Sequence, residues 1–153
     1  MSARVEPVHA LLIALPEASL VIPSAMIAEV ISVPERLTPI PLAERWLLGV
    51  FGWRSRPVPV ISFNQLFGVS EPPPGRRSRV VVLYPLPGCQ AHDFFAVPSM
   101  VEPQPRLFED GQEFERADMV RNGVLFETQL GALKAFIPDV DALRRMLYPA
   151  SVA

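Results

Sequence analysis

Residues 46–63 read WLLGVFGWRSRPVPVISF, and this stretch decides which fold the rest of the chain can adopt. It holds two apolar segments, 49–54 and 57–61, on either side of a short polar connection at Ser55-Arg56. Apolar, β-branched and aromatic segments separated in this way predict a β-hairpin. Because proline cannot donate to a sheet ladder, Pro57 and Pro59 predict that the second strand lies at an exposed edge or contains a bulge.

Composition also favours a fold built mainly from strands. The chain has 153 residues, of which 50% are apolar, 20% are charged and 18 are proline. A single unit of this length buries about 70% of the surface that its unfolded chain exposes, so it needs no disulfide to be stable. An interior proline removes a helical hydrogen bond and clashes with the preceding turn. We therefore expect a mainly β protein without long helices.

Strand-like segments recur along the chain, with turn residues between them. The clearest is the valine-rich segment 79–84, and residues 69–75 are the best linker candidate because of their prolines and glycine. Residues 139–147 place apolar side chains on one helical face, with Asp139 as the expected N-cap. The other expected strands are 8–15, 20–22, 28–33, 93–97, 124–127 and 132–137, with helical turns at 43–48 and 63–67.

Two pairs of short motifs indicate an internal repeat. The residues 21–24, VIPS, recur as 96–99, AVPS, at an offset of 75. Residues 61–63 have a counterpart in residues 138–140, at an offset of 77. Nearly equal offsets predict one supersecondary arrangement used twice. Two small barrels or curled sheets, each closed by a short helix, would satisfy this pattern and would leave few exposed sheet edges.

Several partners are disfavoured by the charge and hydropathy patterns. The longest apolar run, residues 10–15, is far shorter than the roughly 20 residues of a membrane-spanning helix, so we expect no direct membrane insertion. The net charge of −2 disfavours general nucleic-acid binding. Arg76, Arg77 and Arg79 follow three prolines and form the one locally basic segment, either a solvated linker end or a contact for an anion.

The sequence shows no set of residues suited to catalysis. The chain has one cysteine, Cys89, and two histidines, His9 and His92, too few for the usual zinc ligand sets. A nucleophile and base formed by Cys89 and His92 would lack an orienting third group. Glycine-rich phosphate loops and nucleophile-elbow motifs do not occur. We expect no catalytic residues, no metal and no cofactor, and a lone cysteine fits a reducing cytoplasm.

The opening stretch resembles the signature of the CheW-like domain family. That signature has Gly-Val, then Asn-Leu-Arg-Gly, two variable residues, an apolar residue, Pro, two further apolar residues and Asp-Leu. The matching positions are Gly49, Val50, Arg54, Pro59, Val60 and Ile61, and the departures are Gly52, Trp53, Ser55, Ser62 and Phe63. The order of strands elsewhere extends the resemblance over residues 8–147.

The resemblance implies two small five-stranded β-barrel-like lobes with short helices. It implies a single domain over residues 8–147, with a C-terminal helix at 139–147. We expect lobe 1 at about residues 16–68. Lobe 2 is expected at about residues 79–137, together with the strand from 8–15.

The function implied by the resemblance is that of a non-enzymatic adaptor. Such a protein couples the cytoplasmic tip of a chemoreceptor to a CheA-like histidine kinase, and it is a cytoplasmic protein recruited to membrane-associated receptor arrays. The partner-binding residues carried over from the family pattern or placed beside it are Ile27, Glu29, Phe51, Trp53, Arg54 and Val58.

Within that set, the resemblance pairs Glu29 with Arg54 beside the groove for the receptor helices, and assigns apolar contacts to Ile27 and Val58. An exposed ion pair contributes only about 0–1 kcal/mol, so the pair is either an orienting contact for the partner or a structural clasp. Arginine suits both roles because its rigid fork holds a carboxylate while its plane packs on an aromatic ring. Trp53 is either a core residue or part of the interface.

The departures bear on the identity of the partner. Ser55 replaces a glycine that reaches positive φ easily, so the hairpin is expected to be altered or to accept a different receptor. Ser62 replaces an aspartate but can still cap a helix. A divergent accessory member would fit a separate chemosensory system, such as one that controls type IV pilus motility. The alternative function is a small β-barrel module that binds an anionic ligand or nucleic acid through Arg76, Arg77 and Arg79.

Overall fold

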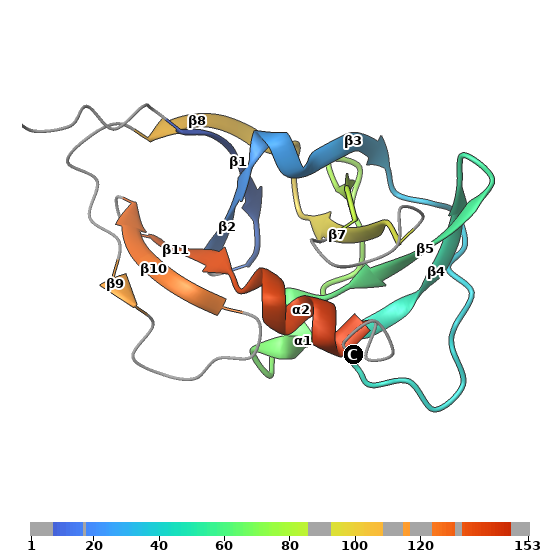
Figure 1. Cartoon of the computed structure of the whole chain (residues 1–153). Helices are drawn as coiled ribbons and strands as arrows, with labels where there is room; N and C mark the ends of the chain where they lie inside the picture. The colour runs from blue at the N-terminus through green and yellow to red at the C-terminus, as the bar shows by residue number, and fades with distance from the viewer. Residues whose placement is uncertain are drawn as a thin grey trace, which may run out of the picture.

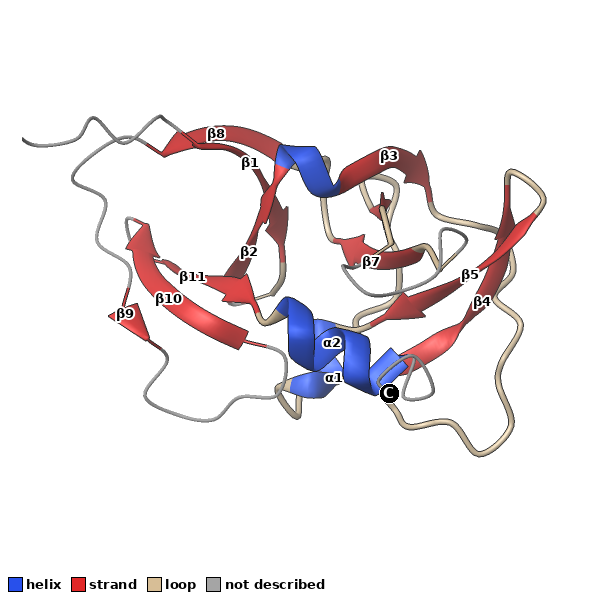
Figure 2. Ribbon diagram, in the orientation of Figure 1, coloured by secondary structure: helices blue, strands red, loops and turns tan. Residues whose placement is uncertain are grey.

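The protein is mainly β, and its described strands form two curved sheets with short helices between them (Figures 1 and 2). The computed structural model describes residues 8–16, 18–85, 93–108, 115–116, 124–130 and 133–147. Sheet A has the order β8 (Gln104–Phe108), β1 (Val8–Ala14), β2 (Ala18–Pro23), β11 (Leu133–Pro138), β10 (Val124–Leu130), β9 (Glu115–Arg116). Sheet B has the order β3 (Ile27–Ser32), β6 (Arg79–Leu83), β7 (Phe95–Ser99), β5 (Arg56–Ile61), β4 (Leu47–Trp53). The helices are η1 (Ser24–Met26), α1 (Phe63–Leu66) and α2 (Val140–Leu147).

The expected repeat is visible in the order of the strands. In sheet A, β2 lies beside β11 in parallel, and β11 forms a hairpin with β10 before α2 begins. In sheet B, β7 lies beside β5 in parallel, and β5 forms a hairpin with β4 before α1 begins. The order β8-β1-β2-β11-β10 therefore corresponds strand for strand to β3-β6-β7-β5-β4.

The two sequence repeats do not correspond to the two sheets. The first hairpin of each repeat lies in one sheet, and the remaining strands of that repeat lie in the other. The β1–β2 hairpin belongs to sheet A, whereas β3, β4 and β5 of the same half belong to sheet B. Likewise β6 and β7 complete sheet B, and the strands after them complete sheet A. The strand sets thus differ from the expected lobes at residues 16–68 and 79–137. Short sequence motifs reveal a repeat but do not reveal which strands pair across it.

Three apolar clusters hold the sheets and helices together. The largest combines residues of sheet A, sheet B and both α-helices, including Ile13, Leu20, Val81, Phe95 and Leu143. A second cluster contains only sheet B side chains among its buried members, and a third contains only sheet A side chains. Because the largest cluster draws on both sheets, neither sheet has a complete core of its own.

The β4–β5 hairpin forms as expected, although its turn is Arg54-Ser55 rather than Ser55-Arg56. Trp53 and Arg56 face each other across the hairpin, and Arg54 and Ser55 have φ of 48° and 61°. Two successive residues at positive φ make a type I′ turn, which matches the twist of paired strands. The non-glycine residues at this turn carry a conformational cost of about 1 kcal/mol or more each.

The expected edge position of the second strand is wrong, because β4 is the outer strand and β5 lies between β4 and β7. Pro57 and Pro59 face Gly52 and Val50 across the hairpin. Counting from the turn, these are the ladder positions that do not hydrogen-bond to β4. On the other side, β5 pairs with β7 only at Val60, beyond both prolines. An interior strand can therefore contain both prolines without losing a required donor.

The outer edge of β4 is covered by the segment that follows β3. Thr38 and Val50 exchange backbone hydrogen bonds of 2.8 and 2.9 Å. The chain can approach so closely because residue 49 is glycine. A Cβ at Gly49 would lie 2.8 Å from the carbonyl oxygen of Thr38, and its φ of 150° also disfavours a side chain. The curl of sheet B is thus completed by one bridge rather than by a continuous ladder.

Both α-helices begin with the same type of cap. The backbone N–H of Gln65 donates to Ser62 Oγ at 3.1 Å, and the N–H of Ala142 donates to Asp139 Oδ1 at 3.1 Å. A side chain that accepts from the residue three positions later satisfies one of the free N–H groups of the first turn. The expected caps are confirmed. The helical turns expected at 43–48 are wrong, because β4 already begins at Leu47.

Candidate functional site

Glu29, Trp53 and Arg54 meet on the surface of sheet B. Glu29 Oε2 accepts one hydrogen bond of 3.0 Å from Trp53 Nε1 and another of 3.0 Å from Arg54 Nη2. The guanidinium carbon of Arg54 lies 4.6 Å from the centroid of the Trp53 ring. A carboxylate, an indole and a guanidinium therefore form one compact cluster, which we call the Glu29 cluster.

Local backbone geometry places each member of the Glu29 cluster. A register shift between Ile27 and Glu29 marks a bulge in β3, and a bulge changes the direction of nearby side chains. Trp53 is the last residue of β4, and Arg54 is the first residue of the type I′ turn. The cluster thus connects β3 and β4, the two outer strands of sheet B.

Exposure differs sharply within the cluster. Trp53 is only 7% exposed and belongs to the sheet B core, where its ring lies 4.9 Å from that of Phe94. The side chains of Arg54 and Glu29 are 66% and 39% exposed. The indole thus fixes the carboxylate from below, and the guanidinium remains accessible above it.

Three further residues extend this surface, and none of them is among the partner-binding residues expected from the sequence. The Phe94 ring lies 5.9 Å from the ring of Tyr84, which is half exposed, and 5.3 Å from the guanidinium carbon of Arg56. Tyr84 follows β6, Phe94 precedes β7, and Arg56 begins β5. In the sequence these residues share only a position at or next to the end of a strand, and the order of the strands in sheet B brings them together.

Besides Trp53, two more of the expected partner-binding residues, Phe51 and Val58, lie in the core. Val58 is fully buried and Phe51 is 7% exposed, and both pack in the same apolar cluster as Trp53. Alternate residues of a strand point to opposite faces, and in the β4–β5 hairpin these two face the interior. Ile27 is half-buried and packs against the largest core cluster. Phe51 and Val58 are thus both buried away from the surface that carries the Glu29 cluster.

The comparisons with known proteins agree with this fold. The model of the CheW-like domain matches residues 9–88, which is more than half of the chain. This chain belongs to the CheW-like domain family. The comparison with curated proteins finds no match. Among solved structures, the scaffolding protein TtCheW from Thermoanaerobacter tengcongensis is similar, with a TM-score of 0.70 and 16% identity over 88% of this chain and 90% of that one.

The departures from the CheW-like signature leave the local fold intact. Ser55 takes the positive φ expected of the usual glycine, so the hairpin keeps its two-residue turn. Ser62, in place of the usual aspartate, caps α1 and also donates to the Glu71 carboxylate. Asn64 Nδ2 donates to the same oxygen at 2.9 Å. Glu71 thus brings a carboxylate to the start of α1, where the signature has one at the capping residue itself.

The basic segment contains one paired arginine, Arg79, and two exposed arginines, Arg76 and Arg77. Arg79 Nε lies 2.8 Å from Glu102 Oε2, whereas Arg76 and Arg77 are exposed at the preceding turn. Cys89 and His92 lie outside the described residues. In the described part of the chain, no three His, Cys, Asp or Glu side chains gather closely enough to hold a metal ion. Its helices are also too short or too polar to cross a membrane.

Proposed function

We propose that this CheW-like protein is a non-enzymatic adaptor in chemosensory signalling. Membership of the family supports a scaffold role. The Glu29 cluster is the observation that carries the finer proposal, because it joins a fixed carboxylate to an exposed guanidinium on an aromatic ring. In this proposal, the cluster docks the cytoplasmic tip of a chemoreceptor.

The chemistry of the cluster suits a helical partner. Arg54 is already oriented by Glu29 and Trp53, so it loses less side-chain freedom on binding than a free arginine would. Tryptophan, tyrosine and arginine are the residues that most often dominate binding energy at interfaces. An amphipathic receptor helix would place apolar side chains against the half-buried Ile27 and the aromatic surface of Tyr84, with an acidic group on Arg54.

Phe51 and Val58 take an indirect part in this proposal. Both pack with Trp53 in the sheet B core, so they support the indole from below without touching the partner. Truncation of either should therefore weaken binding only to the extent that Trp53 moves.

The second proposed partner is a CheA-like histidine kinase. The protein would then be cytoplasmic and recruited to membrane-associated receptor arrays, where it links receptor and kinase. A divergent member of the family fits an accessory system, and we propose one that controls type IV pilus motility.

Charge reversal at Arg54 tests the docking site. We expect Arg54→Glu to weaken binding of a receptor tip fragment at least about tenfold by calorimetry, since it leaves two carboxylates side by side. Arg106→Glu, at an exposed arginine on β8, is the matched control and should bind normally. Normal binding by a folded Arg54→Glu variant would remove Arg54 from the site.

A double reversal separates docking from a structural clasp. The Glu29→Arg, Arg54→Glu variant restores an ion pair between β3 and the turn but inverts the charge presented outside. If the pair only holds the strands together, binding should recover. We expect binding to stay weak while thermal unfolding shows a folded protein, because the partner meets the opposite charge.

A further inference from the structure

A cavity of about 460 Å³ opens at one end of sheet B, under the segment that joins α1 to β6. Small-molecule sites typically have volumes of about 300–1,000 Å³, apolar walls and a few polar groups that orient the ligand. The cavity has such walls. Its apolar lining includes Leu48, Val60, Val80 and Val101, together with the three prolines at 72–74.

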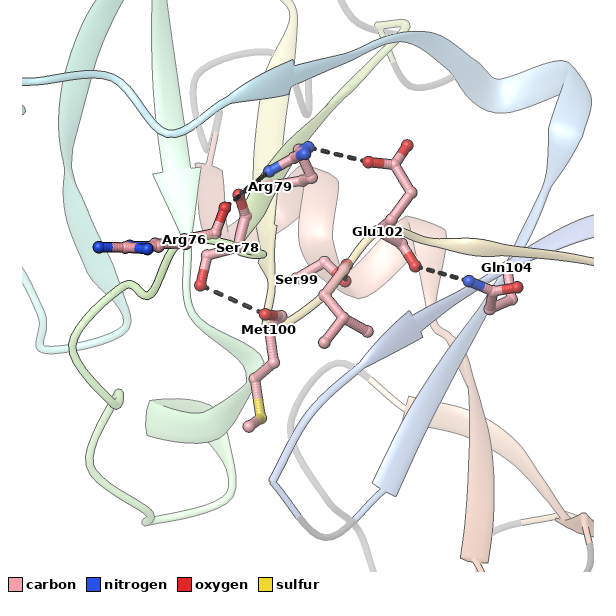
Figure 3. A network of polar contacts seen from close by, with 8 residues as sticks. Arg76, Ser78, Arg79, Ser99, Met100, Glu102 and Gln104 are labelled. Atoms are coloured by element: carbon pink, nitrogen blue, oxygen red, sulfur yellow. Dashed lines mark hydrogen bonds and ion pairs between the residues drawn. The ribbon is translucent and has the colours of Figure 1, made fainter.

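The segment over this cavity is held open at both ends. At one end, Glu71 accepts hydrogen bonds from Ser62 and Asn64 at the start of α1. At the other, Ser78 Oγ accepts from the N–H of Gly75 at 2.8 Å. The same hydroxyl donates to the carbonyl of Met100 at 3.3 Å (Figure 3). Three prolines between these anchors restrict the backbone. The segment therefore has little freedom to collapse into the space below it.

The mouth of the cavity is positively charged. Arg79 is neutralised by Glu102 at 2.8 Å. Arg76 and Arg77 also line the cavity and are exposed, and within the described residues neither guanidinium has a hydrogen-bond or ion-pair partner. Figure 3 shows Arg76 extending away from the Arg79–Glu102 pair. Two free guanidinium groups at the rim of an apolar space are complementary to an anion that carries an apolar tail.

We propose that this cavity binds a single-chain amphipathic anion, such as a medium-chain carboxylate or an alkyl phosphate. Its aliphatic tail fills the space between Leu48, Val60 and Val101, and its headgroup meets Arg76 and Arg77. Each methylene transferred from water to these walls is favourable, and the arginine fork holds a carboxylate or phosphate by paired hydrogen bonds. None of the residues that line the cavity belongs to the Glu29 cluster, so this is a second site on sheet B.

Titration of the ¹⁵N-labelled protein with decanoate and with decyl phosphate, both below micelle concentrations, tests this site. We expect saturable amide shifts that centre on Leu48, Val80 and Val101. The ligand that binds more tightly shows whether the site prefers a carboxylate or a phosphate headgroup. Decanol, which has the tail without the charge, should bind at least about tenfold more weakly.

Two charge-matched variants test the headgroup contact. Arg76→Glu with Arg77→Glu should weaken decanoate binding at least about tenfold, whereas Arg45→Glu with Arg106→Glu, at exposed arginines elsewhere, should change it less than about twofold. Val101→Trp should block the cavity. The proposal is overturned if decanol binds as well as decanoate, if both double variants behave alike, or if no saturable shifts occur at the cavity.

Discussion

Ser62 and Glu71 together replace an aspartate of the CheW-like signature. Ser62 is completely buried and uses its hydroxyl twice, as the acceptor for the α1 cap and as a donor to Glu71. Restoring the aspartate would place a second carboxylate against Glu71 in a buried position. The serine at position 62 and the glutamate at position 71 are therefore coupled. A comparison with the signature at position 62 alone would suggest that the carboxylate is lost.

This coupling gives a prediction for stability. Ser62→Asp should lower the free energy of unfolding by about 2 kcal/mol, because two carboxylates would compete for the same donors. Addition of Glu71→Gln should recover most of the loss, since the amide can donate to the new aspartate. Urea denaturation of both single variants and the double variant measures the coupling. Equal stability of Ser62→Asp and the parent would show that the two side chains do not interact.

Ser55 gives a prediction of the opposite sign. Its φ of 61° is one that glycine adopts without strain. Ser55→Gly should therefore raise the free energy of unfolding by about 0.5–1 kcal/mol, even though glycine is more flexible in the unfolded chain. Ser32→Gly, at an exposed position of β3 with ordinary strand geometry, is the control and should destabilise. A loss of stability in Ser55→Gly would contradict the strained turn.

At the scale of single elements, β4 depends on one glycine more than on the other. Gly49→Ala would push a Cβ against the Thr38 carbonyl at 2.8 Å, whereas a Cβ at Gly52 meets nothing within 4 Å. We expect Gly49→Ala to cost about 2 kcal/mol or more and to release the segment that covers β4. Gly52→Ala should change stability by less than about 0.5 kcal/mol. Hydrogen exchange at the Thr38 and Val50 amides reports the release directly, and continued protection in Gly49→Ala would count against it.

Elements that are specified by a local sequence pattern could be predicted, whereas elements that depend on pairing with a distant strand could not. The β4–β5 hairpin, β6 and the caps Ser62 and Asp139 follow from local patterns. The strand β8 was missed because its first four residues are exposed and one is proline, so it lacks alternation. Its strand geometry comes from pairing with β1, a non-local cause.

The residues of the candidate site also divide into some that could be predicted from the sequence and some that could not. The pairing of Glu29 with Arg54 was expected from the family resemblance, and the structure brings the two side chains together. Phe51 and Val58 were misplaced because a hairpin sequence does not reveal which of its two faces is covered. Tyr84 and Phe94 join the site only through the pairing of β6 with β7.

For the whole molecule, the exchange of hairpins predicts cooperative unfolding. Val21 packs in the cluster confined to sheet A, and Trp53 packs in the cluster confined to sheet B. In a Trp46→Phe background, Val21→Ala should lower the midpoint of thermal unfolding seen by Trp53 fluorescence as much as the midpoint seen by circular dichroism. Separate midpoints would show that the two sheets unfold independently.

The same exchange also determines when each sheet can form during synthesis. The strands of sheet B have all been synthesised once β7 ends at Ser99, whereas Leu20 of β2 must wait for its partner Phe136 of β11. At ribosomal speeds of about 5–20 residues per second, that wait lasts roughly 6–23 s. The β1–β2 hairpin is thus among the first parts to leave the ribosome and among the last to find its neighbours. Until then its open strand edges are the part of the nascent chain most in need of a chaperone.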